Sequence, residues 1–423
     1  MKFSTKAIHS GYSAINNSSH NVPVHKTAAY IFNSSEHAAN LFSLKEAGSI
    51  YSRIMNPTQG VLEERAAQLE GGKGALALAS GTSAVFYTII NICRAGDEIV
   101  SANNLYGGTY TMFASILPEL GIKTVFVDPK DPENFHRAAN SKTRLFYAET
   151  IGNPVLDVAD ISEISAYARK NRVPLVVDST FTTPYLFRPL EHGADIVIHS
   201  LTKWLGGHGN GIGGIVVDGG KFDWSDKKFD LYNRPDTSYE NLVFSSLPEE
   251  MPPFITRMRL VPLRNLGACI SPDNAWQFIQ GIATLPLRMD RHCENALKTA
   301  EFLKKHPAVS WVRYPGLESD PAWKTASKYF SGKFGGMVVF GIKSGLKGGS
   351  RFIDSMKLIS HVANVGDVKS LAIHPASTTH SQLSEEEQQK AGLMPDLIRL
   401  SIGIEDIDDI LEDIDQALKA SLS

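Results

Sequence analysis

The chain has 423 residues, 43% of them hydrophobic and 21% charged, a composition typical of a globular protein with room for two or three domains. Its 42 basic and 45 acidic residues give a net charge of −3, which argues against a nucleic-acid or anionic-membrane partner. Three widely spaced cysteines imply no disulfide framework, and there is neither a signal-peptide core nor an apolar run near the ~18 residues of a membrane span. We therefore expect a cytoplasmic protein.

Residues 1–59 are predicted to form an N-terminal arm. Residues 1–50 are irregular, polar and rich in Ser, Asn and His. Such a long arm often contacts a neighbouring subunit, and the alternative for residues 1–20 is a disordered tail. An amphipathic helix is expected over residues 61–69, ended by two glycines.

From residue 60 to residue 285 apolar strands alternate with helices. The predicted strands are 75–79, 98–102, 123–127, 143–148, 174–177, 196–199 and 214–217, and the predicted helices are 80–92, 108–117 and 160–170. This alternation indicates a mostly parallel sheet covered on both faces, with its ligand site outside the carboxyl ends of the strands. Residues 219–267, rich in proline and aromatic residues, interrupt the pattern and are read as an insertion packed on the body.

A second unit is predicted after a domain boundary near residue 285. A helical pattern over 271–305, interrupted near Pro286, leads into it. Strands at 336–342 and 397–402 and a last helix at 406–420 then indicate a smaller C-terminal α+β domain over residues 286–423.

Lys203 stands at the end of a predicted buried strand, behind the hydroxyls of Ser200 and Thr202 and ahead of a glycine-rich turn. Lysine forms Schiff bases with carbonyl cofactors, and the two hydroxyls could hold a phosphate. The alternative is a surface lysine at the exit of a strand. This stretch alone does not decide between the two.

Asp178 ends another apolar run, at residues 174–177. A buried ionised carboxylate is costly unless it is paired, and a protonated pyridine nitrogen would be a natural partner. The alternative is an N-cap, because an aspartate after a strand often caps the next helix.

Three further features are compatible with a ligand at the same edge. The residues Ser80-Gly81-Thr82 open a helix, where free N–H groups bind phosphate, although an ordinary cap is equally possible. Tyr106 precedes a helix and could stack on a ring, or could be a core or interface residue. Arg399 lies inside an apolar strand and could bind a carboxylate, or could face water on an edge strand.

Two other motifs are set aside. The GxGxxG match at residues 209–214 leads into a strand rather than a helix, which excludes a dinucleotide-binding fingerprint. The spacing of His361, His374 and His380 is not that of metal ligands, so no metal site is expected.

The combined motifs Tyr51-Ser52-Arg53, Asn56-Pro57-Thr58, Ala79 to Thr82, Asp178 to Phe181, His199 to Lys203 and Arg399 to Gly403 resemble the Cys/Met-metabolism family of pyridoxal-phosphate (PLP) enzymes. The resemblance covers essentially the whole chain. It implies PLP as cofactor and the α/β architecture of PLP-dependent transferase fold type I, the aspartate-aminotransferase fold. That fold has a large, mostly parallel sheet domain and a smaller C-terminal domain.

The resemblance also implies roles for individual residues. Lys203 would form the Schiff base, Asp178 would pair with the pyridine nitrogen, and Tyr106 would stack on the ring and assist the leaving group. The cofactor phosphate would be bound by Ser80, Gly81, Thr82, Ser200 and Thr202, and the phosphate in the neighbouring subunit by Tyr51 and Arg53. Asn153 would lie near the cofactor's 3′-oxygen. The substrate would be bound by Arg399 and Asn364.

Within the family, residues 219–267 and 361–367 resemble those of O-acetylhomoserine sulfhydrylases. Methionine γ-lyases carry cysteine where Gly108 stands and usually serine where Asn364 stands. The resemblance implies γ-replacement: O-acetylhomoserine and sulfide, or sulfur from a carrier protein, would give homocysteine and acetate in methionine biosynthesis. It also implies a homotetramer built from dimers that share active sites.

Two alternatives stay open. One is γ-elimination, as in methionine γ-lyases, or a cystathionine γ-synthase or lyase type of activity. The other is a non-catalytic interaction module on the same scaffold.

Overall fold

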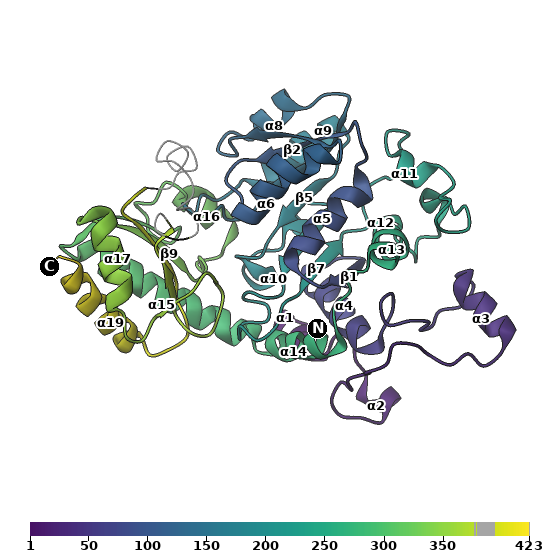
Figure 1. Cartoon of the computed structure of the whole chain (residues 1–423), viewed down its shortest axis with the longest axis horizontal. Helices are drawn as coiled ribbons and strands as arrows, with labels where there is room; N and C mark the ends of the chain where they lie inside the picture. Colours follow the sequence, from purple (N-terminus) through teal and green to yellow (C-terminus); the bar gives the residue numbers. More distant parts are fainter. Residues whose placement is uncertain (376–377, 379–393, 423) are drawn as a thin grey trace.

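Two sheets organise the chain in this computed structural model, which describes residues 1–375, 378 and 394–422. A seven-stranded sheet forms the centre of the molecule, and a five-stranded sheet lies beside it in the C-terminal part (Figure 1). His380, one of the three histidines considered above, lies outside the described residues.

The large sheet has the strand order β1-β7-β6-β5-β4-β2-β3. Except for the edge strand β3, its strands are almost wholly buried because helices cover them, and this explains their continuous apolar sequences. Strands β2 to β6 pair in parallel, as the sequence predicts. The strand bounds are β1 Gly74–Leu78, β2 Glu98–Ala102, β3 Lys123–Val127, β4 Thr143–Glu149, β5 Leu175–Asp178, β6 Ile196–Ser200 and β7 Gly214–Asp218.

Strand β7 runs antiparallel to both of its neighbours, β1 and β6. The physical reason lies in the connection from β6, residues 201–213, which contains turns and no helix. Without a crossover helix the chain reverses at the same edge of the sheet. The glycine-rich turn after Lys203 is therefore pressed against the carboxyl ends of the parallel strands.

Helices pack on both sides of this sheet, with α5 on β6 and β7, α4 on β1 and β7, and α9 on β5. The single helix expected over residues 108–117 is instead α6, a π-helical turn η1 over Met112–Ile116, and α7. The bounds are α4 Pro57–Glu70, α5 Gly81–Ile92, α6 Gly107–Thr111, α7 Leu117–Glu119, α8 Glu133–Ala138, α9 Ile161–Asn171 and α10 Thr183–Leu186, with a 3-10 turn at Pro189–His192.

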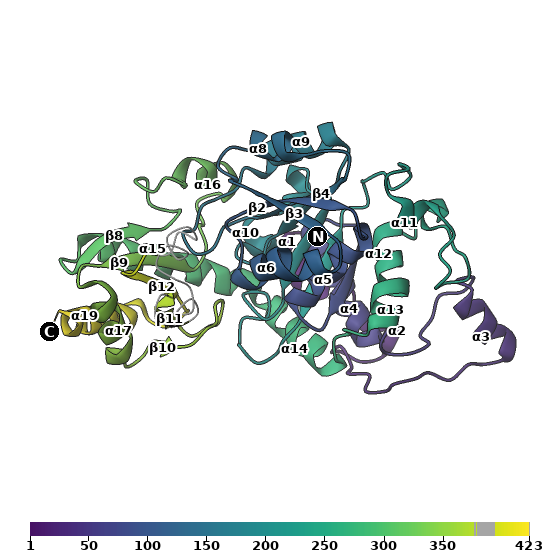
Figure 2. The same cartoon turned by 45° about the horizontal axis from the view of Figure 1, so that its top comes forward.

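The N-terminal residues are less irregular than their sequence predicts. Helix α1 (Phe3–His9) packs on α4 and α14, and its Ala7 is fully buried, so these residues are ordered on the body of their own chain. Helices α2 (Ala14–Asn17) and α3 (Ser35–Phe42) lie on a segment that extends away from the body, on the side opposite the C-terminal domain (Figures 1 and 2).

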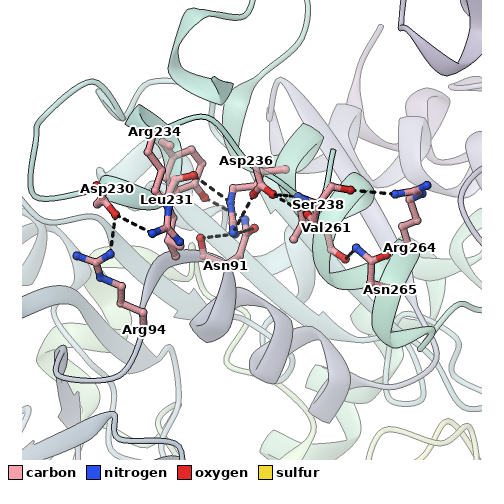
Figure 3. A network of polar contacts seen from close by, with 12 residues as sticks. Asn91, Arg94, Asp230, Leu231, Arg234, Asp236, Ser238, Val261, Arg264 and Asn265 are labelled. Carbon is pink, nitrogen blue, oxygen red and sulfur yellow. Dashed lines mark hydrogen bonds and ion pairs between the residues drawn. The ribbon is translucent and has the colours of Figure 1, made fainter. Parts of the chain in front are cut away.

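The insertion is anchored by a buried arginine. The Arg257 guanidinium donates to the Asn91 side-chain oxygen at 2.9 Å and lies 3.6 Å from the Asp236 carboxylate. Asp230 forms a second ion pair with Arg94 at 2.5 Å (Figure 3). The elements here are α11 Asp230–Asn233, η3 Phe244–Ser246, α12 Pro253–Met258, the π-helix η4 Arg259–Leu263 and α13 Arg264–Leu266.

Helices α14 (Pro272–Ala283) and α15 (Leu285–Lys305) lead to the five-stranded sheet, whose order is β10-β11-β12-β9-β8. Strand β12 lies between β11 and β9 and is an inner strand. No helix of the described residues is long and apolar enough to cross a membrane. The other bounds are β8 Val309–Arg313, β9 Met337–Ile342, β10 Ser360–His361, β11 Leu371–Ile373, β12 Leu397–Ser401, α16 Trp323–Tyr329, α17 Gly345–Ser355 and α19 Ile407–Ser421.

Candidate active site

A cavity of about 250 Å³ lies where several strands of the large sheet end and the C-terminal domain approaches them. Polar groups follow the carboxyl ends of β1, β4, β5 and β6, as expected for an α/β sheet. Apart from Tyr51 and Arg53, every site residue predicted above lines this cavity. These residues are Ser80, Gly81, Thr82, Tyr106, Asn153, Asp178, Ser200, Thr202, Lys203, Asn364 and Arg399.

Lys203 follows β6 and is partly buried in the cavity wall, so it is not a surface lysine. Its Nζ atom donates a hydrogen bond to the Asn364 side-chain oxygen. Burial, and then the nearby positive charge of Arg399, lowers the pKa of the Lys203 amine to about 8. The amine therefore stays mostly protonated near physiological pH, but its neutral fraction is far larger than that of an ordinary lysine.

Asp178 ends β5 and does not cap a helix, because α10 begins only at Thr183 and its N-cap is Thr182. One Asp178 carboxylate oxygen accepts the Thr180 backbone N–H at 2.9 Å. Burial raises the pKa of the Asp178 carboxyl, while the hydrogen bonds from Thr180 and the charge of His199 oppose this rise. The Asp178 carboxyl group therefore lies at the cavity wall and binds a proton more readily than an ordinary aspartate does.

The start of α5 is pressed against β6. A Cβ atom at Gly81 would lie 2.8 Å from the Ser200 Cβ atom, so only glycine allows this approach. The Ser80 hydroxyl accepts the Ser83 N–H at 3.0 Å and so caps the helix. The N–H groups of Gly81 and Thr82, in the first turn, have no acceptor within the helix and border the cavity.

Arg399 approaches the cavity from the inner strand β12, which excludes a water-facing position on an edge strand. Its guanidinium donates to the Asn153 side-chain oxygen at 3.3 Å. Burial lowers the pKa of the Arg399 guanidinium to about 10. Within the described residues no carboxylate forms an ion pair with it, so its charge is available to an anion in the cavity.

Glu149 is a cavity residue to which the sequence analysis assigned no role. It ends β4 and is 7% exposed, and one of its carboxyl oxygens accepts the Tyr106 N–H at 2.8 Å. Burial, and then the neighbouring Asp178, raises the pKa of the Glu149 carboxyl well above its usual range. A carboxylate at the end of an apolar strand was the signal that singled out Asp178, and the same signal could have found Glu149.

Tyr51 and Arg53 are not among the residues that line the cavity. They lie on the segment before α4, where the Arg53 guanidinium carbon is 5.0 Å from the centre of the Tyr51 ring. Tyr51 is 40% exposed, and the buried Arg53 Nε atom has no hydrogen-bond partner in the part of the chain that the structure describes. The structure therefore does not bring these two residues to the site of their own chain.

The GxGxxG match lies in the connection between β6 and β7. Residues 209–214 lead directly into β7 and open no helix. In the described ranges, no three His, Cys, Asp or Glu side chains gather as a metal ion would require.

Comparison with known proteins agrees with this geometry. Residues 4–419 match the model of the family described as Cys/Met metabolism PLP-dependent enzyme. The chain is 55% identical to an O-acetyl-L-homoserine sulfhydrylase of Leptospira meyeri, over 94% of this chain and 92% of that one. It is 48% identical to O-acetyl-L-homoserine sulfhydrylase 1 of Thermus thermophilus, over 99% and 100% of the two chains.

A crystal structure from Campylobacter jejuni that contains N'-pyridoxyl-lysine-5'-monophosphate superposes with a TM-score of 0.96 at 39% identity. The match covers 99% of this chain and 100% of that one. The fold is therefore that of a PLP enzyme, as the sequence motifs predict. The family match spans both sheets and the cavity between them, so the chain belongs to the Cys/Met metabolism family of PLP-dependent enzymes.

Proposed function

We propose that this chain catalyses a γ-replacement in which a sulfur nucleophile displaces acetate from O-acetylhomoserine and gives homocysteine, a step of methionine biosynthesis. The observation that carries the proposal is that Lys203 and Arg399 line one cavity. A partly neutral amine and a guanidinium that has no ion pair within the described residues suit an amino-acid substrate. The relatives named O-acetyl-L-homoserine sulfhydrylase support the choice of this substrate.

The residues at one end of the cavity fit the phosphate of PLP. The N–H groups of Gly81 and Thr82 would bind it at the start of α5, beside the hydroxyls of Ser200 and Thr202. Gly81 leaves the space that a larger residue would fill. Ser80 would act mainly by capping this helix.

The residues at the other end fit the ring of the cofactor. Asp178 would pair with the protonated pyridine nitrogen, Tyr106 would stack on the ring, and Asn153 would lie near the 3′-oxygen. When bound, PLP supplies an electron sink for the negative charge that develops on the substrate. The chain's own residues then bind the substrate and move its protons.

Arg399 would bind the substrate α-carboxylate through two parallel N–H groups, and its contact with Asn153 fixes the orientation of the guanidinium. The Lys203 amine would take the proton from Cα and, once it has released that proton, one from Cβ, and it would return protons to both carbons after the sulfur has bonded. Asn364 holds its Nζ atom in place. Acetate would leave from Cγ with a proton from the Tyr106 hydroxyl. The sulfur nucleophile would then form the new bond at Cγ.

One observation argues against a methionine γ-lyase. A Cβ atom at Gly108 would lie 2.5 Å from the Tyr106 ring. The cysteine that such lyases carry at this position would therefore displace the ring from its present place. This departure from the lyase pattern favours replacement over elimination.

The test is a steady-state assay of the PLP-loaded enzyme with O-acetylhomoserine, with and without sulfide, that follows homocysteine and 2-oxobutyrate together. We expect homocysteine to dominate, and only when sulfide is present. Mainly 2-oxobutyrate in both conditions would identify a γ-lyase and overturn the proposal. Repeating the assay with a protein-bound thiocarboxylate tests whether a sulfur-carrier protein is the donor.

We also propose a cytoplasmic homotetramer built from dimers that share active sites. The support is that Tyr51 and Arg53 lie outside their own cavity, with the Arg53 Nε atom unpaired in the described ranges. Mixing the inactive variants Arg53→Ala and Lys203→Ala tests this. Mixed dimers should regain activity, because one of their two sites has both residues intact. No recovery after confirmed subunit exchange would contradict the shared site.

A further inference from the structure

Two buried carboxyl groups stand side by side at the edge of the large sheet. Glu149 ends β4 and Asp178 ends β5, and the two residues are register partners in this parallel pair. Partners on neighbouring strands lie about 4.8 Å apart and point to the same face of the sheet. Both groups line the cavity. One pyridine nitrogen can pair with only one of them.

Two carboxylates this close cannot both be ionised without a large cost, so one of them keeps a proton. Asp178 has the better support for a negative charge. The Thr180 backbone N–H and hydroxyl hydrogen-bond to it, and the charge of His199 on the neighbouring strand β6 stabilises its anion. His199 in turn contacts the Glu70 carboxylate at 2.5 Å.

Glu149 has less support for a negative charge. Its one hydrogen-bond donor within the described residues is the Tyr106 backbone N–H, and no ion pair reaches it there. The two cations of the cavity hydrogen-bond to neutral amides, Lys203 to Asn364 and Arg399 to Asn153, and not to Glu149. An ionised carboxylate this deeply buried needs a cation or several donors.

The same hydrogen bond gives Glu149 a task. In a neutral carboxyl group, the carbonyl oxygen still accepts the Tyr106 N–H while the other oxygen carries the proton. A second contact, from the Asn153 N–H to the Asn104 carbonyl oxygen at 3.1 Å, joins the same two loops. Both contacts fix the main chain where it enters α6, and so fix the point from which the Tyr106 side chain extends.

We propose that Glu149 is a positioning residue that stays a neutral carboxylic acid, holds the Tyr106 main chain against the cofactor site and leaves Asp178 as the sole anion for the pyridine nitrogen. This rests on the proposed function only in placing PLP between Asp178 and Tyr106. The other ionisable group near Glu149 on its own strand is Tyr147, a buried phenol whose pKa is raised well above its usual range and which is therefore neutral as well.

The test makes the same change, carboxyl to amide, at the two register partners. The variants Glu149→Gln and Asp178→Asn are prepared as holoenzymes, and the visible absorbance of bound PLP is titrated with pH. A neutral acid and an amide carry the same charge. Glu149→Gln should therefore move the midpoint pH of this absorbance titration by less than about 0.3 pH units. Asp178→Asn should shift it by about one unit or more, or release the cofactor.

An equal shift in both variants would show that Glu149 is ionised and would overturn the inference. Infrared difference spectra of wild type against Glu149→Gln give an independent measurement. The carbonyl stretch of a protonated carboxyl group should be present in wild type near neutral pH and absent from the variant. Its absence from wild type would equally overturn the inference.

The positioning role is tested with Glu149→Ala, which leaves the Tyr106 N–H without its acceptor. We expect PLP affinity to fall about tenfold and the circular dichroism of bound PLP to change, with Glu149→Gln restoring most of both. Wild-type affinity and dichroism in the alanine variant would contradict positioning. If the spectra change as expected but the γ-replacement assay yields no homocysteine, the proposed function is wrong and the inference about Glu149 still stands.

Discussion

The large sheet has a pair of buried carboxyl groups at each of its two ends, and the two pairs differ in what surrounds them. Glu149 and Asp178 lie at the carboxyl ends of β4 and β5. Asp195 precedes β6 and Asp218 ends the antiparallel β7, so both lie at the opposite end. Burial raises the pKa of Asp195 to about 6 and that of Asp218 to about 7, and also raises those of Asp178 and Glu149.

A raised carboxyl pKa therefore does not by itself identify the active site. The Asp195 side chain accepts the Leu175 N–H at 2.8 Å, and that of Asp218 accepts the Gly220 N–H at 2.8 Å, so the second pair fixes local backbone. The first pair opens onto a cavity that Lys203 and Arg399 also line. The first pair is distinguished as a candidate catalytic pair by its cavity, by the amine and by a guanidinium without an ion pair among the described residues.

At the end of the sheet that carries the cavity, replacement of Lys203 should have the largest effect on activity. Lys203→Ala removes the proposed base and cofactor attachment, so kcat should fall about 10⁴-fold or more. Assay and visible absorbance check this together, with the exposed Lys227→Ala as control. A variant that kept a tenth of the activity would show that another group removes the Cα proton.

Arg399→Lys keeps the positive charge and loses the paired N–H groups that match a carboxylate. We expect kcat/KM to fall about 100-fold, mostly through a higher KM, because the lost contact serves substrate binding. Arg264→Lys, in the insertion and outside the cavity lining, is the control. An unchanged KM would mean that the substrate carboxylate binds elsewhere.

The local sequence predicted much of this site. Lys203, Asp178 and Arg399 each sit in or next to an apolar strand, where a charged residue is conspicuous, and the parallel sheet predicts that strand ends converge. The pairing of Glu149 with Asp178 could not be predicted in this way, because it depends on which strands become neighbours and in which register. Helix α1 was missed for a similar reason, since its stability comes from packing on α4 and α14.

At the opposite end of the sheet, a change at Asp218 should alter the stability of the protein rather than its activity. The folded-state pKa of Asp218, about 7, lies above the unfolded value of 3.8, so the folded protein binds more protons between these pH values. The free energy of unfolding therefore falls as pH rises from about 4 to 7, by roughly 2 to 4 kcal/mol from this group.

Asp218→Asn removes this titration and should flatten the decrease between pH 5 and pH 8, as measured by urea unfolding at both pH values. Activity should change little, because the residue lies outside the cavity lining. The exposed Glu250→Gln should leave the slope as in wild type. An Asp218→Asn slope equal to that of wild type would mean that Asp218 is not the buried acid responsible.

The smallest effect is expected at Thr180, whose hydroxyl oxygen accepts the Ser200 N–H at 2.9 Å and which also hydrogen-bonds to Asp178. Thr180→Val removes both contacts with little change of shape. PLP should therefore bind about five- to tenfold more weakly, which corresponds to a loss of about 1 kcal/mol of hydrogen bonding. Thr180→Ser should restore the affinity because it keeps the hydroxyl. Titration of the apoenzyme with PLP measures this.

The same change at the buried Thr299 on α15 gives the matched control, and there PLP affinity should stay as in wild type. If Thr180→Val also bound PLP as tightly as wild type, the Thr180 backbone N–H and His199 would be sufficient to hold Asp178 as an anion. The distinction between the two ends of the sheet would then rest on the cavity and its cations alone, and not on how each carboxyl group is hydrogen-bonded.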